Sequence, residues 1–201
     1  MRHGRRIGVF GGAFDPPHLA HRAIAIAALQ QLNLDELRVI PTGQAWHKAR
    51  TLTDARHRLA MVELNFCDLP GVVIDQRELA RAGPSFTIDT LREIRAETPS
   101  VELFLLIGED QARALTSWRE WQEVTRLSII CVAARVDLAR TDTDFKPPVG
   151  FEARFMTLQT PPMALSATQI RGCVATQQGI APLVFEPVAR YIDHHHLYQD
   201  A

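Results

Sequence analysis

Two histidines three positions apart, His18 and His21, follow a pair of adjacent glycines, Gly11 and Gly12, near the start of the chain. A proline pair directly before His18 favours a helix start, so we expect both imidazole rings on one face of the first helical turn. Glycines without Cβ atoms leave the neighbouring backbone amides open to an anion. Such residues are typical of a site that holds negative charge as it develops on a phosphorus centre.

The segment from Gly11 to His21 lacks the marks of two common phosphate sites. A Walker-type loop needs Lys followed by Ser or Thr, and a dinucleotide fingerprint needs a third glycine at the helix start. The segment also contains no Ser or Cys that could act as a nucleophile. It therefore predicts direct transfer between two bound substrates, without a covalent enzyme intermediate. A surface histidine pair, half of a zinc site in a metallohydrolase and a noncatalytic nucleotide sensor are the alternatives.

A second candidate group lies near the other end of the chain, at Ser166, Thr168 and Arg171. Ser166 can cap a helix, Thr168 adds a hydroxyl, and the Arg171 guanidinium is a fork that matches phosphate oxygens. This combination suits a leaving pyrophosphate, and a capped surface helix with a solvated arginine is the alternative. Between the two groups, Asp110 follows a predicted strand and could accept hydrogen bonds from ribose hydroxyls.

The elements that must position these residues alternate along the chain between strand and helix patterns. We expect strands near residues 7–10, 37–40, 72–74, 101–107 and 127–133, with 155–158 as a possible edge strand. We expect helices near residues 18–32, 54–66 capped by Thr53, 85–98, 120–126, 166–175 and 187–197. This order predicts an α/β fold, a doubly wound Rossmann-like parallel sheet of about five strands. The chain 1–201 reads as a single domain, with a core over about 1–160 and a small helical C-terminal part over about 161–201. Ligands of such sheets bind beyond the carboxyl ends of the strands.

Composition narrows the class of protein. The 201 residues carry a net charge of −1, which argues against a broad basic face for nucleic acid, and no apolar run is long enough for a membrane span. Cys67, Cys131 and Cys173 are far apart and lack metal-ligand spacing, so we expect core thiols in a reducing cytoplasm. A homo-oligomer is possible. The tract His194–His196 is expected to be a solvated helix end rather than a metal site.

The residues 11–21 resemble the G-x-F-D-P-x-H-x-G-H signature of the nucleotidyltransferase superfamily, with Ala20 in place of its usual glycine. Residues 165–171 resemble its I-S-S-T-x-I-R motif and depart from it at Leu165 and Ala167. Further matches downstream resemble one family within it, the nicotinate-nucleotide adenylyltransferases. The resemblance covers residues 6–198 and implies that His18, His21 and Arg171 are catalytic.

The resemblance also implies two sets of binding residues. The set implied for ATP is Gly11, Gly12, Phe14, Asp15, His18, His21, Gly108, Asp110, Ser166, Thr168 and Arg171. The set implied for the mononucleotide is His47, Lys48, Ser85, Phe86, Thr87 and Trp118. From the residues alone, Trp118 could instead be a core residue, and Asp15 could orient a histidine, reach the nucleotide through water, or cap the first helix.

The reaction implied by the resemblance joins ATP and nicotinate mononucleotide to give nicotinate adenine dinucleotide and pyrophosphate, a step in NAD biosynthesis. Mg²⁺ is expected to be carried by the ATP phosphates, because the sequence offers no carboxylate cage and no protein metal site is expected. Nicotinamide mononucleotide and pantetheine phosphate are the alternative substrates.

Overall fold

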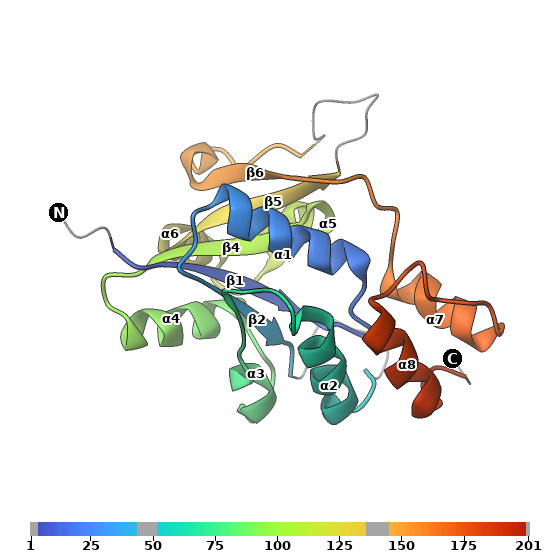
Figure 1. Cartoon of the computed structure of the whole chain (residues 1–201). Coiled ribbons are helices and arrows are strands. Elements are labelled where there is room, and N and C mark those ends of the chain that lie inside the picture. Colours follow the sequence, from blue (N-terminus) through green and yellow to red (C-terminus); the bar gives the residue numbers. More distant parts are fainter. Residues whose placement is uncertain (1–3, 44–51, 136–144, 200–201) are drawn as a thin grey trace.

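The fold is seen in a computed structural model that describes residues 4–43, 52–135 and 145–199 (Figure 1). Its sheet has six parallel strands in the order β3-β2-β1-β4-β5-β6. The strands are β1 (Arg6–Gly12), β2 (Glu36–Pro41), β3 (Val72–Ile74), β4 (Glu102–Gly108), β5 (Ser128–Arg135) and β6 (Phe155–Thr160). This order winds outward from β1 in both directions, which confirms the doubly wound prediction.

Helices connect the strands and cover both faces of the sheet. The α-helices are α1 (Leu19–Gln31), α2 (Ala55–Phe66), α3 (Arg77–Ala80), α4 (Thr87–Glu97), α5 (Glu109–Ala114), α6 (Trp121–Leu127), α7 (Ala167–Ala175) and α8 (Glu186–His194). Two short 3₁₀ helices are η1 (Leu115–Ser117) and η2 (Glu152–Arg154). Figure 1 shows α1 and α4 on opposite sides of the sheet.

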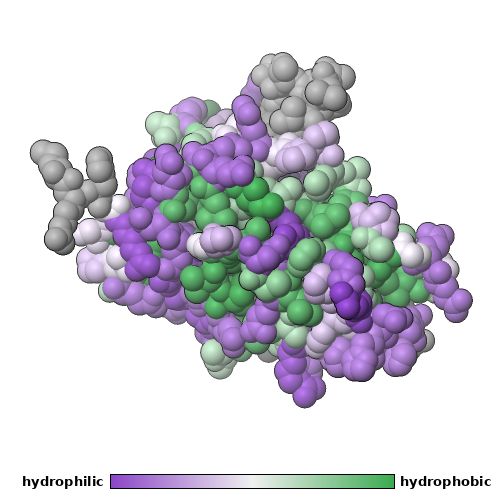
Figure 2. Space-filling model, in the orientation of Figure 1, coloured by the Kyte–Doolittle hydropathy of each residue, from purple (hydrophilic) through white to green (hydrophobic). Residues whose placement is uncertain are grey.

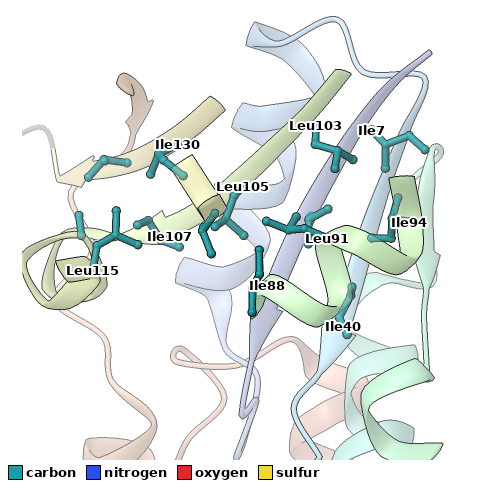
Figure 3. Close-up of a cluster of buried hydrophobic side chains, with 14 of the residues drawn as sticks. Ile7, Ile40, Ile88, Leu91, Ile94, Leu103, Leu105, Ile107, Leu115 and Ile130 are labelled. Carbon is teal, nitrogen blue, oxygen red and sulfur yellow. The ribbon is translucent and has the colours of Figure 1, made fainter. Parts of the chain in front are cut away.

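The hydrophobic core has two main layers because the strands of this sheet are buried on both faces. Leu103, Leu105 and Ile107 of β4 pack with Leu91 and its neighbours from α4, as Figure 3 shows. The residues between them, Phe104 and Leu106, belong to the opposite cluster, which includes the buried alanines of α1. The small side chains of α1 let this helix lie close to the sheet and fix where its N-terminus points.

The C-terminal helices form a third apolar cluster with α2. Met61 of α2 packs against Ile170 of α7 and against Val188 and Ile192 of α8, all of them buried. Figure 1 shows α8 beside α2, at the end of the sheet where β1 runs into the start of α1. The predicted helical C-terminal part therefore lies at the carboxyl edge of the sheet, where the site was expected.

Several predictions of detail need correction. The sheet has six strands rather than about five, because β6 pairs with β5 along its length. Asp54, not Thr53, caps α2, since the Asp54 carboxylate accepts from the amide of Arg56. The last helix ends at His194, before the predicted limit of 197. Cys67 is exposed and Cys173 only half-buried, so Cys131 alone is a core thiol, and burial raises its pKa to about 12.

The outer surface mixes polar and apolar residues. Figure 2 shows hydrophobic residues over the middle of the face on which α1 lies, with hydrophilic residues around the rim. Among the described residues, no helix has the length and apolar character that crossing a membrane requires.

Candidate active site

One large pocket lies beyond the carboxyl ends of β1 and β4, where the winding of the sheet changes direction. The loops that follow two such strands diverge, and this leaves room for a ligand between them. The cavity has a volume of about 1030 Å³. All the candidate residues given above for ATP and for the mononucleotide line it, except His47 and Lys48, which lie outside the described residues.

The pocket has two ends of different composition. We call one the histidine end, formed by His18, His21, Ser166, Thr168 and Arg171. We call the other the tryptophan end, formed by Ser85, Phe86, Thr87, Trp118 and Arg119.

The two histidines are held as a stacked pair at the start of α1. Their ring centroids lie 3.7 Å apart and their planes meet at 25°. His18 is the N-cap residue in extended conformation, one position before the predicted first turn. Its backbone N–H donates to Nδ1 of His21 over 3.1 Å. Because that nitrogen accepts, the neutral His21 ring carries its proton on Nε2, where it can be donated to a ligand.

Phe14 and the two glycines shape the loop in front of His21. The Phe14 side chain is buried, with its ring edge-on to His21 at a centroid distance of 5.0 Å. A Cβ at Gly12 would lie only 3.0 Å from Cζ of Phe14, whereas a Cβ at Gly11 would meet no atom within 4 Å. Gly12 is therefore needed for packing of the Phe14 ring, and Gly11 is the glycine that leaves space in the pocket.

Asp15 joins this loop to the C-terminal residues. Its carboxylate accepts from the Tyr198 hydroxyl over 2.7 Å and from the backbone N–H of Thr53 over 3.2 Å. Burial, followed by the nearby Asp15 charge, raises the pKa of the Tyr198 phenol above its ordinary value, so that Tyr198 stays a donor. The observed contacts make Asp15 an anchor for the loop that carries His18.

Arg171 reaches the same loop from α7. Its Nη1 donates to the backbone carbonyl of Asp15 over 2.7 Å, and its Nη2 donates to the Thr168 hydroxyl over 3.1 Å. Ser166 caps α7 by accepting from the amide of Gln169 over 3.2 Å. The two motifs lie about 150 positions apart in the sequence, and the fold brings them to one end of one cavity.

A buried arginine that the sequence analysis missed holds three loops together. The Arg58 guanidinium donates to the backbone carbonyls of Thr53, Ala13 and Thr42 over 2.9, 3.0 and 2.8 Å. Burial lowers the pKa of this group from its ordinary value, although an arginine remains protonated under any physiological condition. The sequence signal that could have indicated this burial is the position of Arg58 on α2, on the same side of the helix as the apolar residues Met61 and Val62. A buried arginine in turn needs several hydrogen-bond acceptors.

The tryptophan end contains apolar surface with a few polar groups. Phe86 is the N-cap of α4, and both Phe86 and Trp118 pack partly against the core. Ser85 is buried, and its hydroxyl has no hydrogen-bond partner among the described residues. Two residues that sequence reasoning missed also line the cavity here, Glu78 and Arg119.

Glu78 is a buried carboxyl in α3, a four-residue helix that sequence analysis did not predict. It accepts from the hydroxyl of Thr90 over 2.8 Å. Burial raises the pKa of Glu78 above its ordinary value, against the opposing effect of that hydrogen bond. This carboxyl therefore loses its proton at a higher pH than an exposed one would.

Besides the histidine end and the tryptophan end, the residues that follow β4 form a further part of the pocket wall. Gly108 is the N-cap of α5, and Asp110 lies in the first turn of that helix. A Cβ at Gly108 would meet no atom within 4 Å, so the glycine leaves the pocket open there. Glu109 forms an ion pair with Arg113 on the same helix. Ala20, at the position of the signature glycine, lines the pocket as well.

The histidine tract lies apart from the pocket. The His195 ring packs against Tyr191 at a tilt of 43°, with centroids 4.2 Å apart, and the Tyr191 hydroxyl lies 3.0 Å from Nδ1 of His57. Within the described ranges, no group of three or more His, Cys, Asp or Glu residues is placed to hold a metal ion.

Known proteins resemble this chain in both sequence and fold. The family model described as Cytidylyltransferase-like matches residues 9–172. The probable nicotinate-nucleotide adenylyltransferase of Albidiferax ferrireducens is 58% identical, with 98% of this chain and 100% of that protein covered. The corresponding protein of Methylibium petroleiphilum is 45% identical, with coverages of 96% and 92%. Among solved structures, Plasmodium falciparum nicotinic acid mononucleotide adenylyltransferase complexed with NaAD has a TM-score of 0.77 at 19% identity, with coverages of 97% and 98%. That last likeness is one of fold.

Proposed function

The chain belongs to the nicotinate-nucleotide adenylyltransferase family, and we propose on this premise that its pocket joins ATP to nicotinate mononucleotide. The products are nicotinate adenine dinucleotide and pyrophosphate, in a step of NAD biosynthesis. The observation that carries the proposal is the hydrogen bond of 2.7 Å from Arg171 to the carbonyl of Asp15, which brings the two phosphate-binding motifs to one cavity. A cavity of about 1030 Å³ has room for both substrates.

The proposed mechanism is an in-line displacement at the α-phosphorus of ATP. An oxygen of the mononucleotide phosphate forms a bond to this phosphorus while the bond to the bridging oxygen of the leaving pyrophosphate breaks on the opposite side. His21, which carries its proton on Nε2, and the adjacent His18 donate to the oxygens on which charge increases. Arg171, Ser166 and Thr168 bind the departing pyrophosphate. Catalysis then consists of positioning and electrostatic stabilisation.

The remaining walls of the pocket suit the nonreacting parts of the two substrates. We assign the pyridine ring to the tryptophan end, where the aromatic faces of Trp118 and Phe86 can stack on a flat heterocycle. The open amides at the start of α4 can receive its carboxylate. We assign the adenosine to the wall formed by Gly108 and Asp110, whose carboxylate can accept from ribose hydroxyls. His47 and Lys48 stay a prediction for the mononucleotide phosphate.

We propose that Mg²⁺ enters with ATP and is bound mainly by its phosphates. Support comes from the donors lining the histidine end, which are cationic or neutral and so suit the phosphate oxygens rather than a bare metal ion. The ion would neutralise part of the triphosphate charge. The residues named above would still orient the reacting groups.

A substrate panel tests this function. Pyrophosphate release from ATP is measured with nicotinate mononucleotide, nicotinamide mononucleotide and pantetheine phosphate in parallel. We expect the highest kcat/KM with nicotinate mononucleotide, and faster turnover of pantetheine phosphate would overturn the proposal.

The stereochemistry at a chiral α-phosphorus is a second measurement. In-line transfer requires inversion, whereas net retention would indicate a covalent intermediate.

We also propose that the protein works in a reducing compartment, the cytoplasm, as its free cysteines suggest. A homo-oligomer stays a prediction.

A further inference from the structure

Arg119 brings a positive charge to the tryptophan end of the pocket. It follows Trp118, the C-cap residue of η1, and both residues line the cavity. The Arg119 Cζ atom lies 4.7 Å from the centroid of the Phe86 ring. This contact holds the guanidinium next to the N-cap of α4. The charge therefore lies beside the wall to which the pyridine ring is assigned.

The charge of Arg119 is largely available to a ligand. Among the described residues, Arg119 forms an ion pair only with Glu120, at 3.7 Å, and the Arg119 side chain is 54% exposed. The Glu120 carboxylate is bound more closely by Arg92, at 2.5 Å, and this hydrogen bond is the largest cause of its lowered pKa. A ligand anion at Arg119 would therefore not have to displace a strong ion pair.

The other charges at this end do not cancel that of Arg119. Glu78 is the acidic residue that lines the cavity here, and its carboxyl accepts a hydrogen bond from Thr90. Its burial favours the neutral form. The amides at the start of α4, a helix of 11 residues, contribute further positive potential. Asp89, in the first turn of α4, does not line the cavity, so Arg119 is the charged lining residue at this end that attracts an anionic substituent.

We propose that Arg119 determines substrate specificity, because its guanidinium favours a pyridine ring bearing a carboxylate over the same ring bearing a carboxamide. This inference rests on the proposed function and adds to it a residue that discriminates between the two mononucleotides. A carboxylate gains from the nearby cation, whereas a neutral amide of nearly the same shape gains much less. Arg119 thereby acts on the choice of substrate and not on the phosphorus chemistry.

Steady-state kinetics of Arg119→Gln with both mononucleotides test the proposal. We expect the ratio of kcat/KM for the acid to that for the amide to fall about fivefold, as for loss of a partly exposed charge pair. The change should appear in the KM for nicotinate mononucleotide, with the KM for ATP unchanged. Arg119→Lys should recover most of the ratio, and added salt should reduce the difference between wild type and variant.

Arg126→Gln is the matched control, because it removes an exposed arginine charge 3.5 Å from Glu123 while Arg126 does not line the cavity. It should leave the ratio as in the wild type. An unchanged ratio in Arg119→Gln, or an equal fall in both variants, would overturn the inference and leave the proposed function standing. Absence of pyrophosphate release by the wild type with either mononucleotide would overturn the proposed function, and this inference with it.

Discussion

At the histidine end of the pocket the anchoring groups are buried and bonded to backbone, whereas at the tryptophan end Arg119 is half exposed over a single ring. The histidine end is joined by contacts from α2, α7 and the C-terminal residues. The tryptophan end is built mostly from residues 78–90 and 117–119. Buried hydrogen bonds to backbone are thus concentrated at the end where the proposed mechanism stabilises charge. At the end that we propose selects the substrate, a single exposed side chain can be replaced without loss of a buried contact.

The largest expected effect lies in the buried support of the histidine end. Arg58→Leu removes three charge-assisted hydrogen bonds and leaves three carbonyls without that donor, so we expect the free energy of unfolding to fall by about 4 kcal/mol. Urea denaturation measures this change. Arg56→Leu, on the same helix with a side chain that is 87% exposed, should change it by less than about 0.5 kcal/mol. Equal small effects of the two variants would contradict the supporting role of Arg58.

The second largest effect is expected for His21, the proposed hydrogen-bond donor to the reacting phosphate. His21→Ala should lower kcat on the order of 10²-fold, as for loss of one preorganised donor, with little change in stability. His21→Gln retains an N–H group at the end of the side chain and should lose less. His195→Ala, outside the pocket, should keep full activity in the same pyrophosphate assay. Full activity of His21→Ala would show that this ring does not stabilise the developing charge.

A smaller effect is expected at the link between Asp15 and the C-terminal residues. Tyr198→Phe removes a hydrogen bond to a buried carboxylate and should lower the free energy of unfolding by about 1.5 kcal/mol. Tyr191→Phe removes a hydrogen bond between the Tyr191 hydroxyl and the ring of His57 and should cost about 0.5 kcal/mol. Thermal unfolding of the two variants and the wild type measures both losses of stability. A larger loss in Tyr191→Phe would mean that Asp15 does not depend on Tyr198.

The smallest effect concerns the tryptophan end and depends on pH. Burial raises the pKa of Glu78 above its ordinary value of 4.5, so its contribution to stability is fully present below that value and is lost as pH rises through the folded-state pKa. Glu78→Gln stays neutral at every pH. Relative to wild type, this variant should therefore gain stability as the pH rises above the ordinary pKa of a glutamate, 4.5. Melting temperatures measured across this range check the sign, and a constant difference would contradict it.

Local patterns in the sequence predicted most of the histidine end. Glycine, proline and histidine spacing marks a strand, a turn and a helix start within residues 6–21, and each of these is decided by nearby backbone sterics. The sheet was likewise predictable, because strands buried on both faces appear as continuous apolar runs. Only the short β6 was left uncertain, since Met156 and its neighbours at this edge are partly exposed.

The residues missed by sequence reasoning are charged side chains whose environment is set by distant segments. Arg58 and Glu78 look like ordinary surface residues until the fold buries them. Arg119 differs from its neighbours only because Phe86, 33 positions earlier, lies beneath its guanidinium. Burial of single polar groups depends on tertiary contacts, which hydrophobic periodicity does not encode. The four-residue α3 was missed for a similar reason, because it is too short to show a helical period.

The hydrogen bond between Asp15 and Tyr198 spans 183 positions of the chain. During translation, the loop that carries His18 is made early, yet its anchor emerges from the ribosome only after almost all the other residues described here. A nascent polypeptide that stops short of Tyr198 would therefore contain both histidines and Arg171 but lack the hydrogen bond that anchors their loop. We therefore expect the geometry that binds the triphosphate to form late, when synthesis of the chain is nearly complete.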